Sequence, residues 1–145
     1  MMNLVSQILK KKGSKVWCIA PDATVYDALV LMAEKGVGAL VVVDEWQVVG
    51  IFGERDAVLN VELRGRSAKT AQVREVMSTD VYRVAPGTSI EEAMALVTES
   101  HCRHLPVIAN EQLVGLVSIG DLVKAMLDEK DFVIKELHKY IKGEL

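Results

Sequence analysis

Asp121 and Asp56 are the residues whose type and surroundings are best suited to hold a sugar. Asp121 closes the string Gly115-Leu-Val-Ser-Ile-Gly-Asp121, and Asp56 stands 65 residues before it. One carboxylate can accept hydrogen bonds from both adjacent hydroxyls of a ribose, and its charge strengthens each bond. Ser118 could share the ribose or a phosphate. The alternative is structural, a serine N-cap and an acid in the first turn of a helix, and the residues alone favour it.

Arg103 and His104 could supply the positive charge that phosphate groups require. The guanidinium of Arg103 is a planar fork that can contact two phosphate oxygens at once. His104 titrates near neutral pH, so its participation would make phosphate affinity depend on pH. The alternative for His104 is a satisfied residue at the edge of a strand.

These candidates belong to an internal repeat. Residues 16–58 align without a gap on residues 81–123, and 13 of the 43 positions are identical. Two copies are too few for a stacked solenoid, so we expect the pair to close on itself with pseudo-two-fold symmetry and clefts at the seam.

The two copies differ in the residues that could bind a ligand. Gly38 and Ala39 stand where the second copy has its arginine and histidine, and Gly53 stands where it has the serine. The first copy keeps Asp56. We therefore expect a strong site around Asp121 and a weaker or differently selective one around Asp56.

Each copy has the pattern of a β-α-β-β-α unit. Strands are predicted over residues 16–19, 39–43 and 48–52, and over 81–84, 105–109 and 113–117. The first helix begins after Thr24 or Ser89, with a Ser-x-x-Glu capping box in the second copy, and ends at Gly36 or His101. The second helix is predicted from about 54 to before 65, and from about 120 to about 141.

We expect residues 1–65 to form the first repeat with an N-terminal segment, and residues 66–145 to form the linker and the second repeat with a long C-terminal helix. Together they make one paired α/β unit. The apolar N-terminal segment and the last helix flank the pair, and helices that cover a seam are natural dimer surfaces. The sequence therefore predicts a homodimer.

Composition argues against several classes of protein. The 145 residues carry a net charge of −3, and no apolar run has the length of a membrane span, so nucleic acid and membrane are not expected partners. Cys18 and Cys102 form no metal-binding pattern and are expected to be reduced, buried thiols of a cytoplasmic protein. No GxSxG, HExxH or P-loop string is present, so we expect no metal, no required cofactor and no catalysis.

The repeat order and three strings resemble the CBS domain, and the pair resembles a Bateman module. The strings are Gly115 to Asp121, Arg103-His104-Leu105-Pro106-Val107 and Val76-Met77-Ser78. A narrower resemblance, to small stand-alone CBS-pair proteins of bacteria and plant mitochondria, rests on Glu54-Arg55-Asp56, Gly65-Arg66-Ser67-Ala68-Lys69 and Tyr140-Ile141-Lys142-Gly143. The resemblance implies an α/β fold of two β-α-β-β-α CBS repeats. It also implies that such pairs often dimerise and hold AMP, ADP, ATP, NAD or S-adenosylmethionine.

The resemblance favours ligand binding over the structural role for Asp121. Arg55 and Lys69 could each meet a phosphate, although a solvated surface cation is the alternative for both. Adenine would need an apolar slot with a few backbone bonds. Its walls could be Val37, Val81, Tyr82, Cys102 and Pro106, for each of which a plain core role is the alternative.

Two functions remain open from the sequence. The first is a non-catalytic regulatory module that binds an adenine nucleotide, with AMP, ATP or NAD as the expected ligand, and signals energy or redox state to an unknown partner protein. The second is a structural or protein-interaction module that has lost its ligand, for which Gly53 and the uncharged Gly38-Ala39 pair are mild support.

Overall fold

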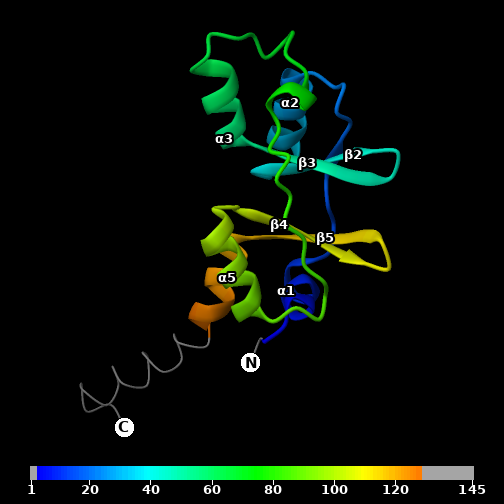
Figure 1. Cartoon of the computed structure of the whole chain (residues 1–145), viewed down its shortest axis with the longest axis vertical. Helices are drawn as coiled ribbons and strands as arrows, with labels where there is room; N and C mark the ends of the chain where they lie inside the picture. The colour runs from blue at the N-terminus through cyan, green and yellow to red at the C-terminus, as the bar shows by residue number, and fades with distance from the viewer. Residues whose placement is uncertain (1–2, 129–145) are drawn as a thin grey trace, which may run out of the picture. The chain divides into compact units, whose positions relative to one another are not determined.

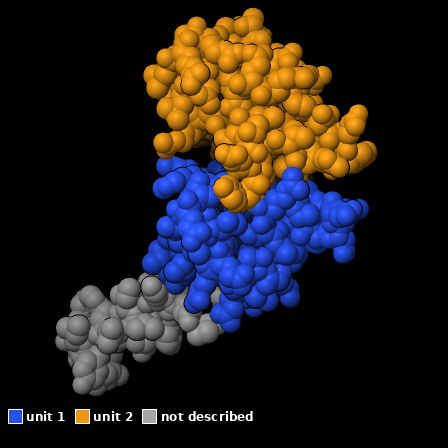
Figure 2. Space-filling view, viewed as in Figure 1, with its two compact units in different colours: residues 1–14, 83–145 blue, residues 15–82 orange. Residues whose placement is uncertain are grey.

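The computed structural model describes residues 3–128, which form two compact units (Figure 2). Unit 1 takes in residues 3–14 and 83–128 of the described chain, and unit 2 consists of residues 15–82. Each unit combines one repeat with the segment that precedes the other repeat. The compact units and the predicted boundary after residue 65 are therefore different divisions of the chain.

Unit 2 contains the first repeat and a three-stranded sheet (Figure 1). Its elements are β1 (Cys18–Ile19), α2 (Val25–Lys35), β2 (Ala39–Asp44), β3 (Gln47–Gly53), α3 (Glu54–Ala57), the π-helical turn η1 (Val58–Glu62) and α4 (Val73–Val76). Strand β1 runs parallel to β2, and β3 runs antiparallel to β2. The predicted order of elements is confirmed in this repeat.

Unit 1 contains the second repeat and a two-stranded sheet. Its elements are α1 (Val5–Lys12), α5 (Ile90–Ser100), β4 (His104–Ala109), β5 (Gln112–Ser118) and a helix that begins at residue 119 and is described to residue 128. The strand predicted over 81–84 is wrong, because only a single parallel bridge joins Val84 to Val107. The predicted continuation of the last helix to about 141 lies outside the described residues.

The helix ends follow the predicted signals in both repeats. Thr24 Oγ1 accepts a hydrogen bond from the Asp27 amide at 3.1 Å, and Ser89 Oγ accepts one from the Glu92 amide at 3.0 Å. These side chains satisfy amides that the first turn leaves without partners. At the other end Gly36 and His101 both have a left-handed backbone, with φ of 64° and 58°.

The segments that precede the repeats, called here the first arm (residues 3–12) and the second arm (residues 71–80), dock in matching ways. The first arm binds the second repeat, and the second arm binds the first repeat. Three backbone hydrogen bonds hold the first arm: Val5 N to Thr88 O, Ser6 N to Pro86 O, and Ile90 N to Asn3 O. The second arm makes the three equivalent bonds: Val73 N to Ala23 O, Arg74 N to Pro21 O, and Val25 N to Ala71 O. The arms are therefore related at an offset of 68 residues, three more than the repeats.

Each arm packs onto a glycine of the hairpin beneath it. A Cβ atom on Gly115 would lie 2.6 Å from Leu9 Cδ1, and one on Gly50 would lie 2.6 Å from Met77 Sδ. Both distances are far below van der Waals contact. The identity of Gly50 and Gly115 in the two repeats is thus explained by the arms.

The core of unit 1 includes the first arm. Val5, Ile8 and Leu9 are all less than 9% exposed and pack with residues of α5, β4 and β5. Their apolar character therefore serves the chain's own core. These three side chains are therefore not available to a partner chain, whereas Leu4 of the same segment is 38% exposed, and the predicted dimer surface stays a prediction.

Cys18 is exposed and Cys102 is half-buried, so the expectation of two buried thiols is wrong. Among residues 3–128, no helix combines the length and the apolar composition that a membrane crossing requires.

Candidate functional site

Asp121 and Ser118 form a reciprocal pair where the last described helix begins. The Ser118 amide donates to Asp121 Oδ2 at 2.8 Å, and the Asp121 amide donates to Ser118 Oγ at 3.0 Å. This arrangement is a capping box, which satisfies amides at the start of a helix. The structural role that the residues alone favour is therefore present, and any ligand must bind to a carboxylate that already has this partner.

Lys12 reaches the same carboxylate from the first arm. Its Nζ lies 2.6 Å from Asp121 Oδ2 and donates a second bond to Leu116 O at 3.1 Å. The side chains are 40% exposed for Lys12 and 24% exposed for Asp121. The pair is thus partly exposed to solvent.

The charge of Asp121 is stabilised in this setting. Burial acts to raise the pKa of the carboxyl, but the hydrogen bond from Lys12, the bond from the Ser118 amide and the charge of Lys12 together outweigh burial. The pKa of Asp121 therefore lies below its ordinary value. The group is an anion at neutral pH and can accept hydrogen bonds from a ligand.

Arg103 and His104 lie beside this pair. His104 is paired with Ser118 across the β4-β5 ladder, and Arg103 O accepts a bond from the Ile119 amide at 2.8 Å. Arg103 is exposed and His104 is half-buried. The structure thus brings together four residues predicted from two separate sequence strings, and adds Lys12. The four are Arg103, His104, Ser118 and Asp121.

Asp56 has the same backbone setting in unit 2 with different side chains around it. The Gly53 amide donates to Asp56 Oδ2 at 2.9 Å, as the serine amide does in unit 1. The hydroxyl of Ser78, from the second arm, donates to Asp56 Oδ1 at 3.0 Å. Gly38 O accepts from the Glu54 amide at 3.2 Å, so the start of β2 lies beside the aspartate, as Arg103 lies beside Asp121.

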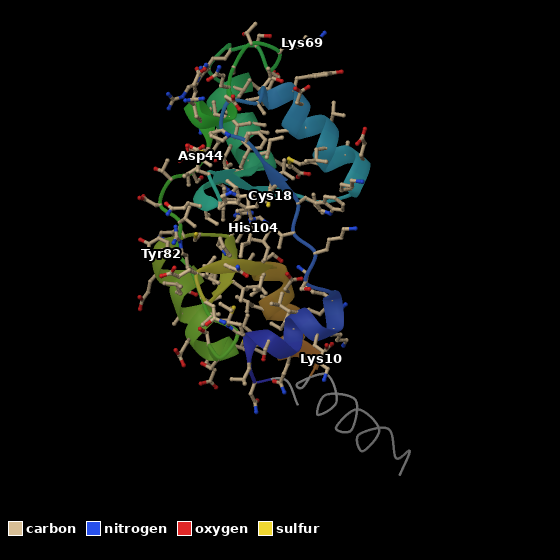
Figure 3. All side chains as sticks on the ribbon, turned by 90° about the vertical axis from the view of Figure 1, so that its right-hand side faces the viewer. Lys10, Cys18, Asp44, Lys69, Tyr82 and His104 are labelled. Carbon is tan, nitrogen blue, oxygen red and sulfur yellow. The ribbon has the colours of Figure 1, made fainter. Side chains whose placement is uncertain are left out.

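The remaining predicted residues of unit 2 have separate settings. Arg55 is exposed next to Asp56, and Val37 is half-buried with its amide bonded to Met32 O. Lys69 is exposed on the linker, with its Nζ 5.5 Å from the centre of the Tyr26 ring (Figure 3). Val81 is half-buried and its amide bonds Thr79 O. The contacts that the structure gives for Lys69 and Val81 do not join them to the group around Asp121.

Sequence reasoning missed Lys12 as a site residue. A single alignment offset matches the repeats but not the arms, and 109 residues separate Lys12 from Asp121. The signal that could have found it is the apolar pattern of residues 5, 8 and 9, which returns at residues 73, 76 and 77. Within the described part of the chain, no group of three or more His, Cys, Asp or Glu residues could hold a metal ion.

Comparisons with known proteins agree with this architecture. A family model of the CBS domain matches residues 5–62 and 73–128. The chain is 38% identical over 149 residues to the CBS domain-containing protein CBSX3, mitochondrial, of Arabidopsis thaliana, covering 96% of this chain and 72% of the plant protein.

Two solved structures show the same fold. One is a CBS-domain protein from Burkholderia ambifaria MC40-6, named as a signal-transduction protein, with 47% identity and a TM-score of 0.82 over 86% of this chain and 94% of that one. The other is a hexameric CBS-CP12 protein from bloom-forming cyanobacteria, with 31% identity and a TM-score of 0.77 over 85% of this chain and 67% of that one.

Proposed function

The chain belongs to the CBS-domain family, and from this premise we propose that it binds an adenine nucleotide and reports occupancy to a partner protein. CBS pairs are generally non-catalytic regulatory modules that bind ligands. The observation that carries the proposal is the group in unit 1, where an anionic Asp121 stands beside Ser118, Arg103 and His104.

The residues of this group match the parts of a nucleotide. The carboxylate of Asp121 accepts ribose hydroxyls through a charge-assisted bond. Arg103 is exposed and offers a bidentate donor to phosphate oxygens, and it directly precedes His104, the first residue of β4. AMP, ATP and NAD share both features, so each is a candidate ligand of this site.

Isothermal titration calorimetry of the full chain with AMP, ATP and NAD tests the proposal. We expect heat from at least one of them and a matching rise in the melting temperature, since a ligand that binds only the folded state stabilises it. No heat and no thermal shift at millimolar ligand would contradict nucleotide binding.

The same negative result would favour the second function, an interaction module without ligand. The observation behind this alternative is the capping role of both aspartates, because each already accepts a bond from a backbone amide of its own unit. A partner protein would then bind the module in a single conformation that does not depend on a ligand.

We also propose self-association. The helical segments after β3 and β5 leave apolar side chains exposed, namely Val58 at 50%, Leu59 at 44%, Val123 at 38% and Leu127 at 52%. The cyanobacterial relative is hexameric by name, whereas we expect a homodimer here. Light scattering coupled to size-exclusion chromatography should give twice the mass of the chain, and the mass of one chain would contradict the proposal.

Cellular location stays a prediction. Composition predicts a cytoplasmic protein, and the Arabidopsis thaliana relative is mitochondrial by name.

A further inference from the structure

Lys12 changes which hydrogen bonds the Asp121 carboxylate can offer. Oδ2 of Asp121 accepts from Lys12 Nζ at 2.6 Å and from the Ser118 amide at 2.8 Å. These two bonds use both lone-pair positions of that oxygen. Oδ1 accepts no bond from residues 3–128 and remains available, so the carboxylate has one open oxygen and not two.

The ammonium of Lys12 has a proton to spare. It carries three N–H donors, of which one goes to Asp121 and one to Leu116 O. The third finds no acceptor within the described chain. Because the Lys12 side chain is 40% exposed, a ligand bound at Asp121 can approach it.

A ribose at this position therefore meets one acceptor and one cationic donor. A ribose with two free hydroxyls satisfies both, because one hydroxyl donates to Oδ1 and the other oxygen accepts from Lys12. A ribose that carries a phosphate on one of these oxygens keeps a single hydroxyl for Oδ1 and presents anionic oxygens to Lys12. A carboxylate without a cation would instead repel that phosphate, as an acidic residue at the ribose does in dinucleotide sites.

We propose that Lys12 is a ligand-binding residue of the Asp121 site, and that it lets this site accept adenine nucleotides phosphorylated on the 2′ or 3′ oxygen of the ribose. The proposal rests on the proposed function, since it presumes that a nucleotide binds at Asp121. It adds a residue from outside the repeat and a chemical class of ligand.

Calorimetry of the full chain with AMP and with adenosine 2′,5′-bisphosphate tests the proposal. The wild-type chain should bind the bisphosphate at least as tightly as AMP. Lys12→Met should weaken the bisphosphate roughly tenfold, because a charged hydrogen bond is lost, and AMP less than about threefold. Lys12→Arg should keep most of the affinity for both.

Lys11→Met is the matched control. Lys11 lies in the same turn of α1 and pairs with Asp128 at 3.2 Å, so its loss removes an equal charge without touching Asp121. We expect this variant to bind both nucleotides as the wild type does. Melting curves recorded without ligand identify any variant that fails to fold, and Lys12→Arg then carries the comparison.

The outcomes separate this proposal from the proposed function. If the wild type binds AMP but binds the bisphosphate more than tenfold more weakly, the proposal is wrong and nucleotide binding stands. Equal losses of both ligands in Lys12→Met, or the same losses in Lys11→Met, also overturn it, because Lys12 then acts only on the fold or on overall charge. If neither nucleotide binds, both proposals fall.

Discussion

Unit 1 and unit 2 place an aspartate in the same backbone setting and surround it with different chemistry. In both, the amide three residues earlier donates to Oδ2, at 2.8 Å for Asp121 and 2.9 Å for Asp56. The arm that docks on each unit then contributes a lysine to Asp121 and a serine hydroxyl to Asp56. The repeat thus preserves the helix cap, while the arms and the residues just before the neighbouring strands give each carboxylate different surroundings.

Removing the arm anchor should give the largest effect on stability. Leu9 is 8% exposed, and truncation of a buried leucine leaves a cavity, so Leu9→Ala should lower the free energy of unfolding by about 3 kcal/mol. Its counterpart Met77 is half-buried, so Met77→Ala should cost less. Urea unfolding of the two variants measures the difference. Equal losses of unfolding free energy in the two variants would contradict this difference between the arms.

The two glycines beneath the arms should differ in the same experiment. A Cβ on Gly50 would approach the backbone oxygen of Ser78 to 2.9 Å, whereas the three atoms nearest to one on Gly115 all belong to the side chain of Leu9. Side-chain ends move more readily than backbone, so Gly50→Ala should cost about 2 kcal/mol and Gly115→Ala about 1 kcal/mol. A larger loss in Gly115→Ala would reverse this part of the comparison.

The helix ends offer a smaller contrast. His101 takes the left-handed backbone that Gly36 takes in the first repeat, and a non-glycine residue is strained there. His101→Gly should therefore stabilise unit 1 by up to about 1 kcal/mol, and Gly36→His should destabilise unit 2 by a similar amount. Thermal unfolding checks both signs. Destabilisation by His101→Gly would show that the imidazole makes contacts that outweigh the strain.

The pairing of Lys12 with Asp121 should add a modest acid dependence. Because the folded pKa of Asp121 is lowered, the contribution is present above the unfolded pKa of about 3.9 and is lost as pH falls through the lower folded value. The pair is partly exposed, so its loss should cost less than about 1 kcal/mol. Asp121→Asn should flatten the dependence of unfolding free energy on pH between about 5 and 2, relative to Lys11→Met. Identical profiles would contradict the assignment.

Local patterns carried much of the fold. We could predict the repeat, both hairpins, the Thr24 and Ser89 caps and the helix end at His101 from the sequence, because each has a local sequence signal. The docking of the first arm on the second repeat, and of the second arm on the first, was not predictable from the repeat. It is a tertiary contact that leaves the sequence pattern of either repeat unchanged. Four residues of the unit 1 group came from separate strings, whereas Lys12 could be found only once the arm had been placed.

The central claim is tested most directly by titrating AMP into the wild type, Asp121→Asn and Asp56→Asn. Both substitutions leave an amide oxygen that can still accept the helix-cap bond, and both remove the negative charge that we propose binds ribose. Asp121→Asn should weaken AMP at least tenfold and Asp56→Asn less than about threefold, since a charge-assisted bond is lost at the stronger site. Equal effects, or a larger loss in Asp56→Asn, would contradict the assignment of the main nucleotide site to unit 1.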